Sequence, residues 1–434
     1  MRISTSLAQQ LGINAMLDQQ TKLSKTQLQL STGQRILTPS DDPAGAVRAL
    51  DLTETLESNR QYQSTLQTGR NRLEFEDSTL ESADNVLQRA RELAVQSVND
   101  TLTTQDRQAI GQEVLQLRDE MLGLANTKNA NGEYIFSGYR SATPAYRFDG
   151  TLIPPGYTYQ GDANQRQLQV GALCSIADGD SGFAVFEDIP SVGLAATTTG
   201  SGKQSVLDTL NTLADALVGK FTVPQGTIRG TADVSTGVDY SGGPVNFDLA
   251  VDGGSAATVT IPAGKYANAN ALASAINTGI ASSSLNGTVF AQAKSGHIEF
   301  VSATSGAAST VTISNDAGGF LTAAGFSDPQ TGPGADLGAD PFHDTVTASL
   351  TDIDTALQRI LDTRASVGAR LNALDTQENM NAKFMTDTQA NLSETQDLDY
   401  AEAISRFNVQ QVALQAAQQA YAKVQGLSLF NYLR

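Results

Sequence analysis

Apolar side chains recur every three or four residues along the segment 350–374, a spacing that predicts a long helix with a coiled-coil-like seam. The seam is interrupted once, by Arg364. Two earlier segments, 66–94 and 110–124, carry similar narrow stripes. Helices of this kind bury their stripes by packing against one another, which predicts a helical bundle. The residues expected in its core are Leu350, Ile353, Leu357, Ile360, Val367, Leu371 and Leu374.

The outermost segments of the chain carry a broader apolar pattern. In 400–430, two adjacent stripes together exceed the apolar face of an ordinary surface helix. One alternative is that this helix is buried within its own domain. The interpretation we favour is that the terminal helices pair and also bury apolar side chains against neighbouring subunits. The predicted assembly-interface residues are Ile3, Leu7, Leu11, Ile404, Phe407, Leu414, Tyr421, Leu427 and Phe430.

The middle of the chain is rich in residues that break helices. Of 38 glycines, 27 lie in 151–344, together with nine of the 12 prolines. This composition predicts strands and turns. Alternating patterns indicate strands at 133–139, 157–162, 166–170, 245–251, 257–261, 288–293, 297–301 and 310–314, with helices at 203–219 and 268–281.

We therefore predict an α+β fold: a long antiparallel helical bundle or coiled-coil core formed by both termini, with a central β-rich outer region inserted. The expected parts are terminal helices in 1–40 plus 392–434 and a bundle domain with β-hairpins in 41–190 plus 345–391. The third part is an outer α+β domain in 191–344. That outer domain includes a compact β-β-α-β-β insertion at about 222–335.

Charge and composition narrow the class of protein. The net charge is −18, of which residues 151–344 contribute −11, so nucleic acid and anionic membranes are poor partners. No apolar run has the length of a membrane span or a signal peptide, so we expect no membrane insertion and no export by the general signal route. The single cysteine, Cys174, cannot form an internal disulfide, and we expect it to be buried and inert.

The chain offers few candidate catalytic or metal-binding residues. Asp41-Asp42-Pro43 is an adjacent carboxylate pair, but it is better explained as a helix start, with Asp42 as N-cap and Pro43 as first helical residue. His297 and His343 lie at no metal-ligand spacing from each other or from Cys174. We therefore expect no enzyme, no metal and no cofactor.

Four segments resemble the flagellin family, and most closely its hook-associated branch. They are Met1–Thr5, Ser31–Ala46 with the sequence STGQRILTPSDDPAGA, Gly132–Tyr139 with the sequence GEYIFSGY, and Leu427–Leu433 with the sequence LSLFNYL. The likeness covers roughly residues 1–220 and 340–434. Residues 222–335 are extra relative to short members of the family, and within them 245–314 is similar to a small insertion found in some of its members.

The resemblance implies a secreted structural subunit of the bacterial flagellum, located at the hook–filament junction. It implies type III export in an unfolded state without a cleaved signal peptide, terminal helices forming an inner tube, and a bend at Asp41, Asp42 and Pro43. The implied partners are other copies in a ring, the first hook-associated junction protein, flagellin and an export chaperone. The alternatives are a filament flagellin, or a surface adhesin or glycan-binding module on a flagellin-like core.

Overall fold

The computed structural model describes residues 5–187, 189–190, 203–221, 223, 225–334 and 340–426, without the side chains of 5–9, 203 and 424–426. The chain forms two compact units. We call residues 1–65 with 376–434 the terminal unit, and residues 66–375 the central unit. Two long helices, α2 (Pro43–Ser97) and α8 (Pro341–Gln396), each contribute residues to both units. The predicted three-part division of the chain stays a prediction.

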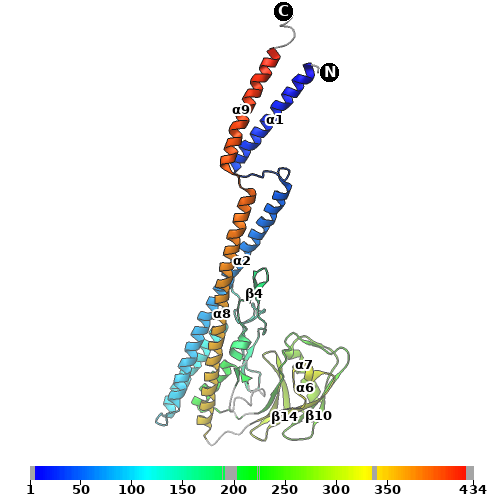
Figure 1. The fold of residues 1–434 in the computed structure, drawn as a ribbon. Coiled ribbons are helices and arrows are strands. Elements are labelled where there is room, and N and C mark those ends of the chain that lie inside the picture. The colour runs from blue at the N-terminus through cyan, green and yellow to red at the C-terminus, as the bar shows by residue number, and fades with distance from the viewer. Residues whose placement is uncertain are drawn as a thin grey trace, which may run out of the picture. The chain divides into compact units, whose positions relative to one another are not determined.

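The described N-terminal and C-terminal regions of the chain are helical, as the composition of these regions predicts (Figure 1). The terminal unit holds α1 (Thr5–Thr32) and α9 (Tyr400–Gly426) beside its parts of α2 and α8. The central unit adds α3 (Thr104–Ala125), α5 (Val206–Leu217), α6 (Ala269–Ala281), α7 (Phe320–Ala324) and a five-residue π-helix, η1 (Phe183–Glu187).

In the central unit, α2 and α8 run antiparallel and are tied by ion pairs along their length. Residues later in α2 pair with residues earlier in α8, and these pairs define the direction and register of the two helices. The pairs are Arg70 with Asp375 (2.5 Å), Asp77 with Arg364 (2.9 Å) and Arg91 with Asp354 (2.6 Å). We call the part of the central unit outside residues 225–334 the stem; it holds α3, α5, η1 and the central unit's parts of α2 and α8.

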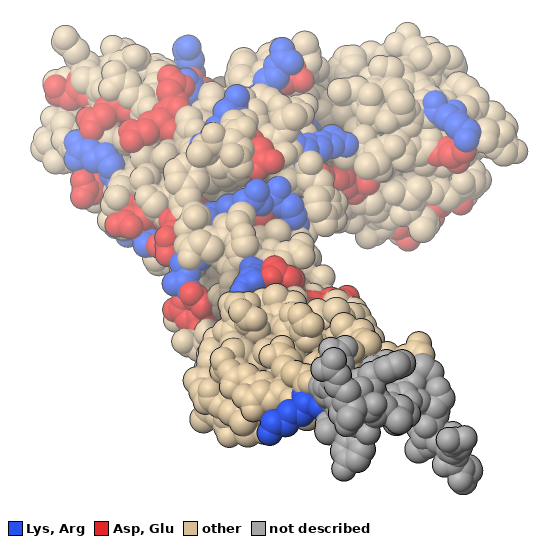
Figure 2. Space-filling view, turned by 90° about the horizontal axis from the view of Figure 1, so that it is seen from above, with Lys and Arg blue, Asp and Glu red and all other residues tan. Residues whose placement is uncertain are grey.

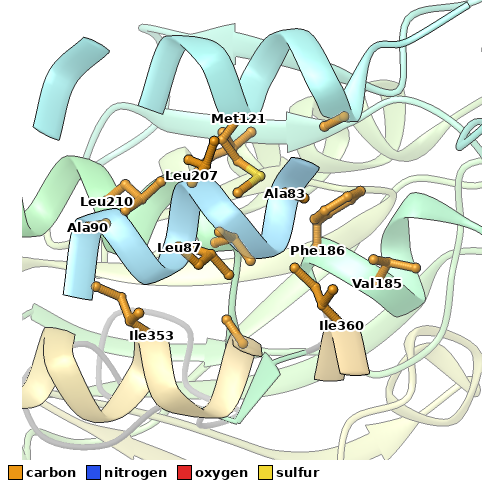
Figure 3. Packing of buried hydrophobic residues seen from close by; sticks show 14 of the residues in the cluster. Ala83, Leu87, Ala90, Met121, Val185, Phe186, Leu207, Leu210, Ile353 and Ile360 are labelled. Carbon is orange, nitrogen blue, oxygen red and sulfur yellow. The ribbon is translucent and has the colours of Figure 1, made fainter. Parts of the chain in front are cut away.

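Between these helices lies a continuous hydrophobic core. In Figure 3, Ala83, Leu87 and Ala90 of α2 are surrounded by Met121 of α3, Leu207 and Leu210 of α5, Ile353 and Ile360 of α8, and Val185 and Phe186 of η1. Small alanines on α2 let the neighbouring elements approach closely. Of the predicted bundle-core residues, Ile353, Ile360, Val367 and Leu374 are buried, and Leu350, Leu357 and Leu371 are partly buried against the same core.

The stem also carries three short antiparallel strand pairs: β1 (Tyr146–Asp149) with β2 (Gly156–Tyr159), β3 (Gln167–Gly171) with β4 (Cys174–Ala177), and β5 (Ile189–Pro190) with β6 (Lys203–Gln204). The predicted strand at 133–139 is wrong. That segment is a series of turns with one isolated bridge between Lys128 and Tyr134. Cys174 is only partly buried, against the stem core.

The insertion, residues 225–334, has a second core of its own. The predicted β-β-α-β-β unit is present as β9 (Val245–Val251), β10 (Ala257–Ile261), α6, β12 (Val289–Lys294) and β13 (His297–Ser305). It is completed by β7 (Gln225–Arg229), β14 (Thr310–Ala317) and β15 (Gln330–Pro333) and by the small pair β8 (Val238–Asp239) and β11 (Lys265–Tyr266). The main sheets have the orders β10-β9-β14-β15 and β12-β13-β7. The α+β class is therefore confirmed.

A buried carboxyl group clamps the segment after β4 onto α2. Glu76 of α2 is 2% exposed, and its Oε1 accepts a hydrogen bond of 2.9 Å from the backbone N–H of Asp180. Arg370 of α8 pairs with Asp180, and Arg72 of α2 pairs with Asp178. Burial, and after it the nearby Asp180 carboxylate, raises the pKa of Glu76 to about 8. Glu76 is therefore protonated at neutral pH.

The raised pKa of Glu76 predicts that the stem loses stability as the pH rises. The protonated form is favoured in the folded state, so its contribution is fully present below the ordinary glutamate pKa of 4.5 and is lost through about pH 8. The free energy of unfolding should fall in this window by at most about 1.4 kcal/mol per pH unit from this group. Chemical denaturation between pH 5 and pH 8.5 measures this slope.

Replacement of the carboxyl group provides the control. Glu76→Gln should make the slope shallower, whereas Glu74→Gln, at an exposed position two residues earlier on α2, should leave it unchanged. An unaltered slope in Glu76→Gln would contradict the assignment of the proton to Glu76.

Candidate assembly interface on the terminal helices

The two terminal helices pack against each other as an antiparallel pair (Figure 1). Apart from Gln29 and Ala413, their less exposed described positions are spaced by four and three residues in turn, the spacing of a coiled-coil seam. On α1 these positions are Gly12, Met16, Gln19, Leu23, Thr26 and Leu30, and on α9 they are Ala403, Phe407, Gln410, Leu414, Ala417 and Tyr421. A methyl group at Gly12 would lie 3.3 Å from Cδ2 of Tyr421, so glycine lets the helices approach closely at that point.

This seam is only weakly apolar. Between its apolar members stand Gln19, Thr26 and Gln410, and the amide oxygen of Gln410 is buried without a hydrogen-bond partner. A polar group at a seam position favours one register of the two helices but costs stability. Among the described side chains of the terminal unit, the buried hydrophobic residues are Ile36, Leu56, Leu398 and Ala403, and neither hydrophobic core cluster includes a residue of this unit.

The apolar side chains of the terminal unit lie mainly on its outside. Of the twenty large hydrophobic side chains that are exposed in the described chain, twelve belong to this unit, although the central unit is more than twice as long. We call these twelve the outer apolar set: Leu11, Ile13, Leu17, Leu28, Val47, Leu50, Met380, Phe384, Tyr400, Ile404, Val409 and Val412. Large contiguous patches of exposed apolar surface commonly mark sites of protein–protein contact, so this set is a candidate interface.

On α1 and α9, members of the outer apolar set such as Leu17 and Val409 lie on opposite sides of the helix pair, whereas four other members lie on α2 and α8. Leu17 and Leu28 are eleven residues apart, about three helical turns, so they share the face of α1 that points away from the seam. On α9 the corresponding face carries Val409, Val412 and the exposed Ala416. The pair therefore presents two separate apolar faces.

Charge is sparse on these helices. The charged residues of α1 are Asp18, Lys22 and Lys25, and those of α9 are Glu402, Arg406 and Lys423. Figure 2 shows the result: the surface next to the grey atoms is almost entirely free of red and blue, whereas other parts of the molecule carry many charged side chains. Little desolvation of charge would therefore oppose burial of these faces against a partner.

Below the helix pair, an elbow formed by residues 33–42 and 397–399 joins α1 to α2 and α8 to α9. Its two strands of chain are linked by backbone hydrogen bonds from Arg35 N–H to the Gln396 carbonyl (2.8 Å) and from Leu398 N–H to the Gly33 carbonyl (2.9 Å). The Arg35 guanidinium also donates to the Thr395 carbonyl (2.8 Å). The orientation of the helix pair within the terminal unit is thus fixed by several bonds.

Asp41, Asp42 and Pro43 close this elbow. Pro43 is the first residue of α2, and Asp42 Oδ1 accepts a hydrogen bond of 2.9 Å from Gly45 N–H, the bond of a helix N-cap. Asp41 accepts from the Lys25 ammonium at 2.5 Å and from the N–H groups of Leu37 and Thr38 at 3.2 Å. The bond from Lys25 is the main cause that lowers the pKa of Asp41 below its ordinary value.

The predicted assembly residues divide into three groups. Leu11 and Ile404 are exposed on the outside of the pair, whereas Phe407, Leu414 and Tyr421 face α1 in the seam. Ile3, Leu427 and Phe430 lie outside the described residues, as does the side chain of Leu7. The exposed residues Val47, Leu50, Met380 and Phe384 of α2 and α8 are not among the predicted residues, because a stripe in the sequence does not reveal which of its apolar side chains remain uncovered in the fold.

The described part of the chain holds no group of three or more His, Cys, Asp or Glu side chains arranged to bind a metal ion. Nδ1 of His343 forms a hydrogen bond of 2.7 Å with Oδ2 of Asp340. The ring of His297 stacks on Phe183, with ring centroids 5.3 Å apart. Among the helices that the structure describes, none combines the length and the apolar character that a membrane span requires.

The unpaired amide of Gln410 predicts that the seam can be strengthened by a single substitution. Gln410→Leu removes a buried acceptor that has no partner, whose burial costs about 1–3 kcal/mol, and adds apolar contact with α1. The monomer should then resist proteolytic cleavage within α9 for longer. Gln411→Leu, at the exposed neighbouring position, is the matched control and should not prolong survival. Equal half-lives of both variants would contradict this account of the seam.

Comparison with known proteins places these helices in a family. The model for the bacterial flagellin N-terminal helical region matches residues 3–141, and the model for the bacterial flagellin C-terminal helical region matches residues 350–433. Flagellar hook-associated protein 3 of Escherichia coli is 31% identical over 217 residues, which cover 50% of this chain and 67% of that protein.

Two further likenesses are a flagellin and a solved structure. A flagellin of Clostridium tyrobutyricum is 38% identical over 115 residues, but these cover only 26% of this chain and 30% of that protein. A solved structure of a putative flagellar hook-associated protein from Vibrio parahaemolyticus aligns over 82% of this chain and all of that chain, at 15% identity and a TM-score of 0.47. Since both terminal regions match and a relative above 30% identity is covered over two thirds of its length, the chain belongs to the flagellin family, in the branch of flagellar hook-associated protein 3.

Proposed function

We propose that this chain is a structural subunit of the bacterial flagellum, an adaptor in a ring that joins the hook to the filament. The observation that carries the proposal is the outer apolar set. The helices α1 and α9 lie in the regions that match the family, and they expose apolar side chains on opposite sides, where a protein partner would bury them. The relative that matches over two thirds of its length is named for association with the flagellar hook.

The two apolar faces suggest how such a ring would be built. In a head-to-tail arrangement, one surface of a subunit contacts a different surface of the next, so each subunit needs two faces. The leucine face of α1, with Leu17 and Leu28, and the smaller valine and alanine face of α9, with Val409 and Val412, differ in shape. Contact between unlike faces would generate a ring or a helical array rather than an isolated pair.

Membership of the family also suggests which proteins contact the ring on its two sides. We propose contacts with the first hook-associated junction protein on one side and with flagellin on the other. Before assembly, an export chaperone would cover the apolar faces of the terminal helices, whose exposure would otherwise favour aggregation. We further propose that the chain is secreted through the flagellar type III channel without cleavage of a signal peptide and acts outside the cell.

The competing functions have weaker support. A filament flagellin would be expected to match flagellins over more of their length than the 30% and 41% found here. An adhesin or glycan-binding role would concern the insertion and would leave the terminal helices unexplained. We also propose that the chain is not an enzyme, since both histidines are held in structural contacts and the family relationship is to structural proteins.

A pair of charges on the α9 face tests the proposal. Val409→Glu with Val412→Glu, at positions 66% and 65% exposed, should leave the monomer soluble and helical, because neither side chain packs within the chain. Buried against a neighbour, the two unpaired carboxylates would prevent assembly. In a strain that lacks its own copy of this gene, the variant should restore neither filament attachment nor swimming in soft agar.

Gln411→Glu with Gln415→Glu places the same two charges elsewhere on α9, at exposed polar positions, and should restore more swimming than the valine variant. Immunogold labelling of complemented cells should mark one band at the base of the filament. Label along the whole filament would favour a flagellin, and normal filaments on cells with the valine variant would sink the proposal.

A further inference from the structure

The insertion touches the stem through a buried joint that is separate from its polypeptide connections. The joint brings Ile153, Tyr159 of β2, Phe183 and Glu187 of η1, and Asp208 of α5 against β12, the end of β7 and the turn between β12 and β13. The insertion residues involved are Arg229, Gln292, Lys294, Ser295 and His297.

Two ion pairs cross this joint with little access to solvent. Lys294 Nζ lies 2.8 Å from Asp208 Oδ2, with side chains 12% and 16% exposed. Arg229 Nη1 lies 3.6 Å from Glu187 Oε1, with side chains 6% and 1% exposed. Breaking a buried pair is costly because it leaves a charge in a poorly solvated place, which distinguishes these pairs from surface salt bridges.

Hydrogen bonds cross the joint beside the ion pairs. Ser295 Oγ donates to Glu187 Oε1 (2.7 Å) and accepts from the backbone N–H of Tyr159 (2.9 Å). The Gln292 amide accepts from Ile153 N–H (3.0 Å) and donates to the Ile153 carbonyl (3.2 Å). Such directional bonds define one orientation of the insertion, which apolar contact alone would not do.

The balance of charge in the joint is close to neutral. Glu187, Asp208 and Glu299 face Arg229 and Lys294, so full ionisation would leave one uncompensated negative charge. Burial raises the pKa of Glu187 and of Glu299, and one oxygen of each carboxyl group has no hydrogen-bond partner. A proton on one of these two groups removes the excess charge.

The joint lies away from the two ends of the insertion. The chain enters the insertion at Gln225 and leaves it after Gly334, and these ends lie side by side, since Gly226 N–H and Gly334 N–H both donate to Ser309 (2.8 Å and 2.6 Å). Arg229 is four residues further along β7, about 13 Å at the rise of a strand. Attachment at two separated places resists rotation, whereas two adjacent connections alone would act as a hinge.

We propose that this joint holds the insertion at one fixed orientation on the stem, so that the insertion is a rigid lateral arm and not a tethered module. In an assembled array, such arms would project at a constant angle set by Asp208 and Glu187 on the stem.

Spin-label distances in the full-length chain test this proposal. Cys174 is the single cysteine of the chain, so Cys174→Ser with Ser82→Cys and Ser255→Cys gives one label on α2 and one in the exposed turn between β9 and β10. Pulsed electron paramagnetic resonance should give a single narrow distance distribution for this reference protein. A broad distribution would overturn the proposal, because it is the result expected of a tether.

Substitutions on both sides of the joint complete the test. Asp208→Asn on the stem and Lys294→Met on the insertion should each abolish the single narrow peak. Lys265→Met removes a comparable lysine–aspartate pair, with Asp239, on the exposed surface of the same insertion and should keep the peak. Because Asp208→Asn changes no residue of the insertion, a broadened distribution there cannot come from misfolding of the insertion. A narrow peak in Asp208→Asn would contradict the proposal.

Discussion

The structure of the terminal unit depends on one constraint: its helices have more apolar surface than they can bury against each other. The seam between α1 and α9 uses up a single stripe of each helix, and part of that stripe is polar, as Gln410 illustrates. The remaining apolar side chains, such as Leu17 and Val409, face outward on opposite sides. A pair built in this way is incomplete alone, because burial of apolar area supplies most of the stability of a helix in a protein.

The central unit solves the same problem within one chain. Its stem places a continuous core between α2, α3, α5 and α8, and its insertion closes a separate core between two sheets. Buried charges then orient parts that apolar packing would leave free to slide, as Glu76 does for the segment after β4 and Asp208 does for the insertion. The chain thus combines a central unit that has two buried cores with a terminal unit that buries few hydrophobic side chains among those described.

Much of this organisation is predictable from the sequence because it rests on local periodicity. The heptad spacing from Leu350 to Leu374 gives α8, and the alternation in 245–251 gives β9. Features that depend on distant partners are not predictable in this way. The aromatic segment 133–139 has the composition of a strand but lacks a neighbouring strand over its length. On α9, Leu414 and Val409 are equally apolar, and only the position of α1 decides that one faces the seam and the other faces out. The pairing of Lys294 with Asp208 spans 86 positions and leaves no local pattern.

We propose that the terminal helices become stable through contact with other subunits, and hydrogen–deuterium exchange measures this stability directly. Backbone amides of α1 and α9 should exchange rapidly in the isolated monomer and slowly in the assembled junction, while amides of the stem core around Leu80 and Ile360 should be protected in both states. Slow exchange of α1 and α9 in the monomer, equal to that in the assembly, would contradict the claim, since the pair would then be stable without a neighbour.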